Sequence, residues 1–460
     1  MKISINSIIG KVGVPCVASC CLVSLGFLSC SSDDSAPKEE PKTHTPMEFV
    51  VGMDNPFSHQ VTRTTIDTNH KPLTDGTNMK LSIQGKWYGH TPQDVVVNCD
   101  GKVGGLYDTY TDINNLTFAT GTEPTWEMFG TFDPDNKVGR EEGVSVYGVA
   151  IDAQGRSKTT ITPPDFVTDD AIQTVHWSLN YEKDVNHVFD YHNYTTSGGK
   201  NLYERDLLIT NNISPTGTTP ADRNAGGSKP GTYKFDYQDW TTYKYCNLIE
   251  FKHAMSMFTA HIIAGKDWPK DADGGGYFED PAHPGDPTKA LHPELVLVGN
   301  NAMDDPYVYT GGTVNITDGT VVPAPDSKQV MYTQTALDQW ECTEYAGETS
   351  GSASGYQPTG KCCSEQKQAL LFPHTPLGRN ADNDLLGIIV LNGNKYYIPA
   401  TEMRKAMKQR HGVTEGHTDW NLTRPGYNYI LRIRLDKTAM TVEAMIDKWG
   451  VVSASELTWF

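Results

Sequence analysis

Residues 427–447 read YNYILRIRLDKTAMTVEAMID, and this stretch decides the fold class. Its apolar side chains recur at every second position, in one run before the polar link DKTA and in another that begins at its end. The apolar positions are Tyr427, Tyr429, Leu431, Ile433 and Leu435 in the first run, and Met440, Val442, Ala444 and Ile446 in the second. Alternation with a period of two is typical of half-buried strands. The stretch therefore predicts a β-hairpin.

The same alternation recurs along the chain, most clearly in Met79–Trp87. Further strands are predicted at Asp94–Cys99, Val144–Ile151, Ile172–Leu179, Leu207–Thr210, Glu294–Val298, Thr313–Ile316, Gln329–Tyr332, Gln368–Phe372, Leu385–Leu391 and Lys395–Ile398. Clusters of Gly, Pro, Asn and Asp separate these runs, and Thr401–Gln409 alone reads as a short helix. Many short strands with turn signals between them predict an all-β protein made of β-sandwiches.

One long apolar stretch, Tyr245–Ile263, changes phase along its length. Phe251 and Met257 share one parity, whereas Phe258 and Ile262 share the other, so we expect a bulge near Met257–Phe258. Residues 266–289, which follow, are rich in Gly, Pro and Asp. We interpret them as a linker that separates an N-terminal sandwich domain, residues 46–265, from a C-terminal sandwich domain, residues 290–460.

The N-terminus has the features of a targeting segment. Lys2 and Lys11 precede a charge-free apolar stretch that ends at Ser29-Cys30, and polar, acidic residues follow. This order resembles a bacterial lipoprotein signal, with residues 1–29 removed, a lipid on Cys30 and residues 30–45 as a polar tether. A weaker match ends at Cys20, and a simple secretory signal is the alternative. The acidic residues after Cys30 resemble a signal for the cell surface, so we expect an outer-membrane lipoprotein.

Charge and cysteine content narrow the function further. The chain carries 38 basic and 56 acidic residues, a formal net charge of −18. Such a balance argues against a nucleic-acid partner, because binding the phosphate backbone requires a cationic face. Beyond Cys30, the mature chain has an odd number of cysteines, which cannot all pair with one another. The pairing among Cys99, Cys246, Cys342, Cys362 and Cys363 stays open, and most are interpreted as buried or incidental thiols.

The first strand candidate after the tether is Met47–Met53. Met47, Phe49, Val51 and Met53 are apolar and share one parity, which predicts that they face a core. Asn55-Pro56 then ends the run.

Several short motifs, taken in order, resemble a known family. They are Asp206-Leu207-Leu208, then Leu248-x-x-Phe251-x-His253-Ala254-x-Ser256, then Leu370-Leu371-Phe372-Pro373-His374, and finally Gly426-x-x-Tyr429 with a closing strand pair and Trp449. Behind a lipoprotein signal, this series is similar to the fimbrillin family, the type V pilus subunits of Bacteroidetes. The likeness covers residues 46–450, and His374 stands where the family usually has Gln.

The resemblance implies two tandem transthyretin-like β-sandwich domains and a structural or adhesive pilus subunit. It also implies cleavage after an arginine by a trypsin-like protease, which would release the first strand so that a strand of a neighbouring subunit could replace it. In this chain Met47–Met53 would be the temporary strand, Arg63 the cleavage site and Gly450–Phe460 the donor. The implied partners are other pilus subunits, the outer membrane through the lipid, and host or bacterial surface glycans or proteins. Stalk, tip and anchor roles stay open.

No residue pattern points to catalysis, and we expect neither enzyme activity nor a cofactor. An acidic stretch, Asp271–Asp280, resembles a calcium loop, but its first position would be Pro269, which has no ligating side chain. His253 is interpreted as a hydrogen-bonded core residue. The alternatives to a pilus subunit are a surface carbohydrate-binding lipoprotein that does not polymerise and a hydrolase. Aromatic candidates for stacking on sugars are Trp87, Tyr88, Trp126, Trp240 and Trp420.

Overall fold

The structure is a computed structural model, and only part of the chain is described. The described residues are 46–53, 73, 75–87, 93–106, 113–121, 123–129, 144–151, 163, 167–169, 172–179, 206–211, 248–272, 275–300, 305–335, 364–412 and 419–448. The signal peptide, Cys30, Arg63, Tyr88, Trp240, the donor candidate Gly450–Phe460 and four of the five remaining cysteines lie outside this range. Their predicted roles stay predictions.

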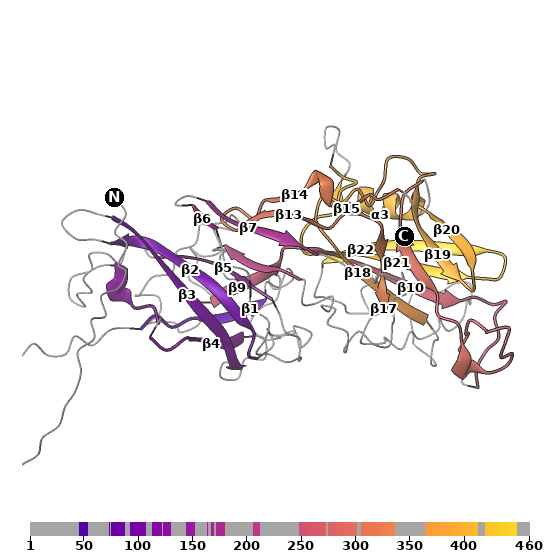
Figure 1. Cartoon of the computed structure of the whole chain (residues 1–460), viewed down its shortest axis with the longest axis horizontal. Coiled ribbons are helices and arrows are strands. Elements are labelled where there is room, and N and C mark those ends of the chain that lie inside the picture. The colour runs from indigo at the N-terminus through magenta and orange to yellow at the C-terminus, as the bar shows by residue number, and fades with distance from the viewer. Residues whose placement is uncertain are drawn as a thin grey trace, which may run out of the picture. The chain divides into compact units, whose positions relative to one another are not determined.

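Seven strands of the N-terminal half pair into a closed barrel. In order around it they are β1 (Val50–Met53), β4 (Ile113–Phe118), β3 (Gln93–Leu106), β2 (Asn78–Trp87), β5 (Ser145–Ala150), β8 (Leu208–Asn211) and β9 (Leu248–His253). All neighbours run antiparallel except β1 and β9, which are parallel. We call this closed set of strands the barrel (Figure 1).

Four further sheets complete the described strands. One has the order β14 (Val321–Pro323), β13 (Gly311–Asn315), β7 (Ile172–Ser178), β6 (Val167–Asp169), and another has β17 (Gln334–Thr335), β18 (Ser364–Leu371), β10 (Ser256–Ala264), β21 (Tyr427–Leu435), β22 (Met440–Lys448). The remaining two are β16 (Met331–Tyr332), β11 (Glu294–Leu297), β19 (Leu385–Leu391), β20 (Asn394–Pro399), and the pair β12 (Val308–Tyr309) with β15 (Lys328–Gln329).

Helix is scarce in the described residues. It comprises α3 (Thr401–His411) and the short 3-10 turns η2 (Trp126–Phe129), η5 (Pro287–Lys289) and η7 (Pro325–Ser327). The all-β prediction is therefore confirmed, as is the closing hairpin, in which β21 pairs with β22 from Tyr427–Lys448 to Leu435–Met440. No helix among the described residues is long and apolar enough to cross a membrane.

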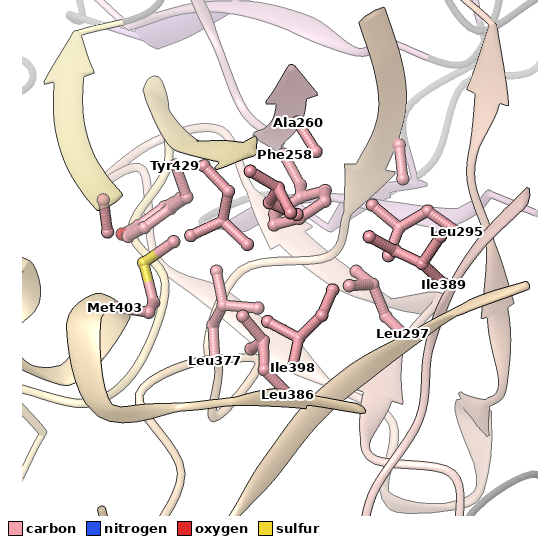
Figure 2. Packing of buried hydrophobic residues seen from close by; sticks show 14 of the residues in the cluster. Phe258, Ala260, Leu295, Leu297, Leu377, Leu386, Ile389, Ile398, Met403 and Tyr429 are labelled. Carbon is pink, nitrogen blue, oxygen red and sulfur yellow. The ribbon is translucent and has the colours of Figure 1, made fainter. Parts of the chain in front are cut away.

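A buried cluster lies between the five-stranded sheet, the sheet that contains β19, and α3. Phe258, Tyr429 and Leu431 enter it from the first sheet, and Leu295 and Ile389 from the second. Figure 2 shows Phe258 and Tyr429 on one side of this cluster and Leu295 and Ile389 on the other, with Met403 of α3 at its edge. Tyr429, Leu431, Ile433 and Leu435, which are alternate positions of β21, face this cluster, as the sequence predicts.

A second cluster fills the barrel, and a third lies where the barrel meets the sheet of β7 and β13. The third cluster includes Val149 and Ile209 from barrel strands, Val175 from β7, Val314 from β13, and Phe372 directly after β18. β7 pairs with β13 over Gly311–Ser178 to Asn315–Thr174. Strands from both sides of residues 266–289 thus share a sheet and a core, and the predicted division at this linker stays a prediction.

The stretch Tyr245–Ile263 differs from its prediction. The interruption falls at Ala254–Met255, between β9 and β10, and β10 itself is regular through Met257 and Phe258. Both parities of β10 are apolar because both of its faces are buried: Met257 belongs to the third cluster and Phe258 to the cluster with Tyr429. A strand with two buried faces does not alternate between apolar and polar side chains. The change of parity within β10 was therefore mistaken for a bulge at Met257–Phe258.

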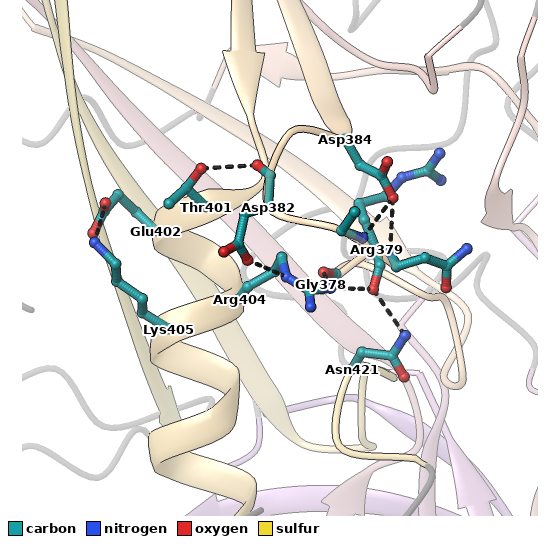
Figure 3. Close-up of polar contacts among 11 residues, drawn as sticks. Gly378, Arg379, Asp382, Asp384, Thr401, Glu402, Arg404, Lys405 and Asn421 are labelled. Atoms are coloured by element: carbon teal, nitrogen blue, oxygen red, sulfur yellow. Dashed lines mark hydrogen bonds and ion pairs between the residues drawn. The ribbon is translucent and has the colours of Figure 1, made fainter.

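One buried arginine ties α3 to the loop before β19. Arg404 donates from Nε to Asp382 Oδ1 at 2.7 Å and from Nη1 to the carbonyl oxygens of Gly378 and Arg379 at 2.9 and 2.7 Å. Asn421 Nδ2 donates to the same Arg379 carbonyl at 3.0 Å. Figure 3 shows these groups converging on the loop. A charged side chain so deeply buried is stable only with such a full set of partners.

Candidate functional site

β1 closes the barrel from a position near the start of the described chain. Val50 and Val51 lie opposite Asn115 and Asn114 of β4 on one side, and opposite Leu248 and Ile249 of β9 on the other. The strand is therefore interior, with a neighbour at each edge. We call the position of Met47–Met53 between β4 and β9 the β1 slot.

The side chains of this segment alternate as the sequence predicts. Met47, Phe49 and Val51 are 2%, 3% and 0% exposed and belong to the barrel core, and Met53 is half-buried against it. The residues just before β1 are also hydrogen-bonded to their neighbours. Met47 N donates to Pro124 O at 2.8 Å, and Leu116 N donates to Phe49 O at 3.3 Å. Burying side chains of this kind contributes roughly 1.5–3 kcal/mol each. The segment is thus part of the core.

The β4 wall of the slot is built on a β-bulge. The register between β3 and β4 shifts between Val103 and Leu106, at Gly104-Gly105. Asn114 Nδ2 donates to Gly104 O at 3.2 Å, and Asn115 Nδ2 donates to Gly105 O at 3.2 Å. Side-chain amides thus bind carbonyls that the bulge leaves out of the ladder. β4 and these asparagines were not predicted from the sequence, although a Gly-Gly pair inside a strand is a signal for a bulge.

The β9 wall ends in a buried hydrogen bond between two side chains. His253 Nδ1 lies 2.7 Å from Asp206 Oδ2, with side chains 14% and 5% exposed. The residues that follow His253 and Asp206 are also hydrogen-bonded to each other, because Ala254 N donates to Leu207 O at 2.8 Å. The hydrogen-bonded role predicted for His253 is what the structure shows, and its partner belongs to the Asp206-Leu207-Leu208 motif.

The end of β9 is also fixed to the closing hairpin. Gly426 N donates to Met255 O at 2.8 Å, and Ser256 Oγ donates to Arg424 O at 2.9 Å. Gly426 has a φ of 72°, in the region where glycine is favoured. Three motifs that are far apart in the sequence therefore meet where β9 passes into β10, and we call this meeting point the β9–β10 junction. Its geometry positions one wall of the β1 slot.

Two aromatic side chains complete the junction. Tyr429 OH accepts from Arg424 N at 2.8 Å and lies 3.0 Å from His411 Nε2. Burial, together with the positive charges of Arg424 and Arg410, lowers the pKa of His411 to about 4, against the smaller opposing effect of Asp419. Neutral His411 can accept a hydrogen bond from the Tyr429 hydroxyl, whose oxygen already accepts from Arg424 N. Burial raises the pKa of Tyr429, which keeps it a donor.

The other candidates from the sequence are placed as follows. Trp126 is buried at 8% exposure, and the ring of half-buried Trp420 has the cations of Arg404 and Lys408 4.9 and 5.1 Å from its centroid. Cys99 is a free thiol in the barrel core, where burial raises its pKa to about 12. The described residues contain no group of three or more His, Cys, Asp or Glu side chains arranged to hold a metal ion.

The arrangement at the β1 slot would allow β1 to be replaced by another extended segment. Without β1, β4 and β9 would become sheet edges with unpaired backbone groups, and the core would open beside them. An extended segment of suitable pattern can satisfy both demands, as in strand addition.

Comparison with known proteins gave matches among solved structures only. A candidate cell adhesion protein from Bacteroides uniformis matches with a TM-score of 0.41 and 9% identity, over 89% of this chain and 100% of its own. The tip fimbrial protein Mfa3 from Porphyromonas gingivalis, truncated at its C-terminus, gives 0.35 and 9%, over 88% and 100%. A fimbrial protein from Bacteroides vulgatus gives 0.33 and 10%, over 87% and 99%. No family model matches the chain, and no curated protein does.

Proposed function

We propose that this chain is a structural or adhesive subunit of a type V pilus, assembled by strand exchange at the β1 slot. One observation carries the proposal: the first described strand is an interior strand of the barrel, paired on both sides, with its inward side chains in the core. The resemblance of the sequence motifs to the fimbrillin family points to the same role. The subunit acts by assembly and adhesion and is no enzyme.

The proposed sequence of events begins with export. The lipid on Cys30 holds the chain at the outer surface of the outer membrane, and cleavage after Arg63 then cuts the connection between β1 and β2. β1 afterwards stays in the barrel only through its non-covalent contacts. Once it leaves, a strand of a second subunit enters between β4 and β9.

Exchange of this kind is directional, because one subunit offers a slot and the other a strand. Head-to-tail contacts do not close on themselves, so they extend into a filament. The segment Gly450–Phe460 is the proposed donor, since it is apolar at several positions. Other pilus subunits are therefore the main partners, with surface glycans or proteins as adhesive targets.

A covalent lock on β1 tests the proposal. Val50 and Asn115 are directly opposed across β1 and β4, so the double variant Val50→Cys with Asn115→Cys can form a disulfide between the strands. We expect this variant to fold and reach the cell surface but to form no filaments by electron microscopy. Adding a reductant should restore assembly, because the lock is then released.

The matched control places the same lock where no exchange is proposed. Lys102 and Thr117 are directly opposed across β3 and β4, and both are exposed. Filaments from Lys102→Cys with Thr117→Cys but not from the β1 lock support the proposal, whereas filaments from both would refute it. N-terminal sequencing of surface filaments tests the cleavage itself: a start at residue 64 supports Arg63, and a mature start at Cys30 removes the cleavage step.

A further inference from the structure

Asn114 carries a buried oxygen that β1 leaves without a hydrogen bond. Asn114 is 2% exposed and has the parity of Leu116, whose side chain is in the barrel core. Its Nδ2 donates to Gly104 O, but its Oδ1 is buried and receives no hydrogen bond. The residue directly opposite on β1 is Val51. The residue opposite this buried acceptor is therefore an apolar valine, which has no hydrogen-bond donor in its side chain.

A hydroxyl side chain would correct this defect at the same position. Directly opposed residues of an antiparallel pair have Cβ atoms about 4.5–5.5 Å apart, within reach of a side-chain hydrogen bond. Threonine has nearly the shape of valine, and its O–H can donate. A buried acceptor without a hydrogen-bond donor costs free energy, and a hydrogen bond to it removes that cost. β1 is thus an imperfect occupant of its own slot at one inward position.

We propose that the β1 slot selects strands that carry serine or threonine at the position of Val51, so that an incoming strand satisfies Asn114 and displaces β1. The inference rests on the proposed strand exchange and specifies what the slot prefers. The occupant is the C-terminal segment of a second copy of this chain. In an extended strand Ser453 and Ser455 share one face with Leu457 and Trp459. These serines are polar residues on the otherwise apolar face of the segment. Opposite Asn114, a serine hydroxyl could donate a hydrogen bond to the buried Oδ1.

Substitution of Val51 in the full-length chain tests the contact. The matched control is Val146, which is 1% exposed in the same core and lies opposite apolar Ile83. Val146→Thr buries a hydroxyl without a partner, so we expect its melting temperature to fall by roughly 2–8 °C. Val51→Thr should melt at or above the wild-type temperature. An equal fall for both variants overturns the proposal.

A second comparison leaves the size of the side chain almost constant. We expect Val51→Ser to melt above Val51→Ala, because serine can donate to Asn114 Oδ1 and alanine cannot. In a chain that also carries Asn114→Val, the acceptor is gone, and Val51→Thr should then lower the melting temperature as it does at position 146. If serine is no better than alanine, the predicted hydrogen bond does not form, and the proposal fails even where the Asn114 variant does not fold.

Assembly kinetics separate this inference from the proposed function. A β1 that already satisfies Asn114 should be displaced more slowly, so Val51→Thr should form filaments more slowly than the wild type. A stabilised Val51→Thr chain that assembles at the wild-type rate would overturn the selectivity. Wild-type chains that never assemble would instead refute strand exchange, and the melting comparison would still decide whether Asn114 is unsatisfied.

Discussion

At the scale of single residues, the Asp206–His253 pair is the contact on which the β9 wall depends most directly. His253→Ala would leave the 5% exposed carboxylate of Asp206 without its partner at 2.7 Å. Leaving such a group buried and unpaired costs about 2–4 kcal/mol, and we expect that loss in urea unfolding. The control is His283→Ala, because His283 forms the same contact with Asp280 at 2.8 Å but is 53% exposed. A similar loss for both variants would contradict a special role for burial.

His411 gives the stability of the molecule a pH dependence of known sign. Its pKa of about 4 in the folded chain lies below the ordinary histidine value of 6.5. Between these values the unfolded chain binds a proton that the folded chain does not, so stability falls as the pH is lowered from 6.5 to 4. His411→Gln keeps an acceptor for Tyr429 but cannot be protonated, and its unfolding free energy should fall less steeply over this range. Equal slopes for variant and wild type would refute this assignment.

The sequence predicts some residues of the site but not others. Parity alone indicated that Met47, Phe49 and Val51 face a core, because alternation is a local property of the chain. It could not indicate Asn114, whose importance comes from the strand opposite and from the bulge beside it. Arg404 is similar, since nothing in its own segment shows that three oxygens from residues 378–382 surround its guanidinium group.

At the scale of elements, α3 and the loop before β19 depend on Arg404. Lysine at this position keeps the charge but not the planar arrangement of donors that reaches three acceptors. We expect Arg404→Lys to speed hydrogen exchange at Asn380 and Ala381, whose amides donate to Asp384 within the same loop. The control Lys405→Met removes only the exposed pair with Glu402, so exchange in the loop should be unchanged. Unchanged exchange in Arg404→Lys would show that the loop is held by other contacts.

The strands themselves were easier to predict than their partners. The runs at β2, β5, β7, β19 and the closing hairpin are confirmed. β2 and the hairpin show the period of two, whereas β5 and β19 are apolar runs that are buried on both faces. Short strands such as β12 and β15 carry too few residues to show a period. Nothing in β1 indicates that it pairs in parallel with β9, because that pairing joins residues that are about two hundred positions apart. Local patterns specify which face of a strand is buried, whereas the neighbour depends on the whole chain.

At the scale of the whole described molecule, a shared core opposes independent behaviour of the two halves. Phe372 is fully buried in the third cluster with Val149, Val175 and Val314, so it contacts a core built from both sides of residues 266–289. Its backbone also connects the sheets, since Phe372 N donates to Tyr309 O at 3.0 Å. Coupled cores unfold together, whereas domains joined only by a linker unfold separately.

Calorimetry of Phe372→Ala tests this coupling. Removing a fully buried phenylalanine costs about 3–5 kcal/mol, and here the loss falls on the cluster that connects the halves. We expect one transition for the wild type and two for Phe372→Ala, because the barrel and the C-terminal sheets each keep a core of their own. Leu295→Ala, which lies in the cluster of Phe258 and Tyr429 and not in the third cluster, should lower the melting temperature without dividing the transition. Two transitions in the wild type would instead support independent domains, and strand exchange at the β1 slot would then act on the barrel alone.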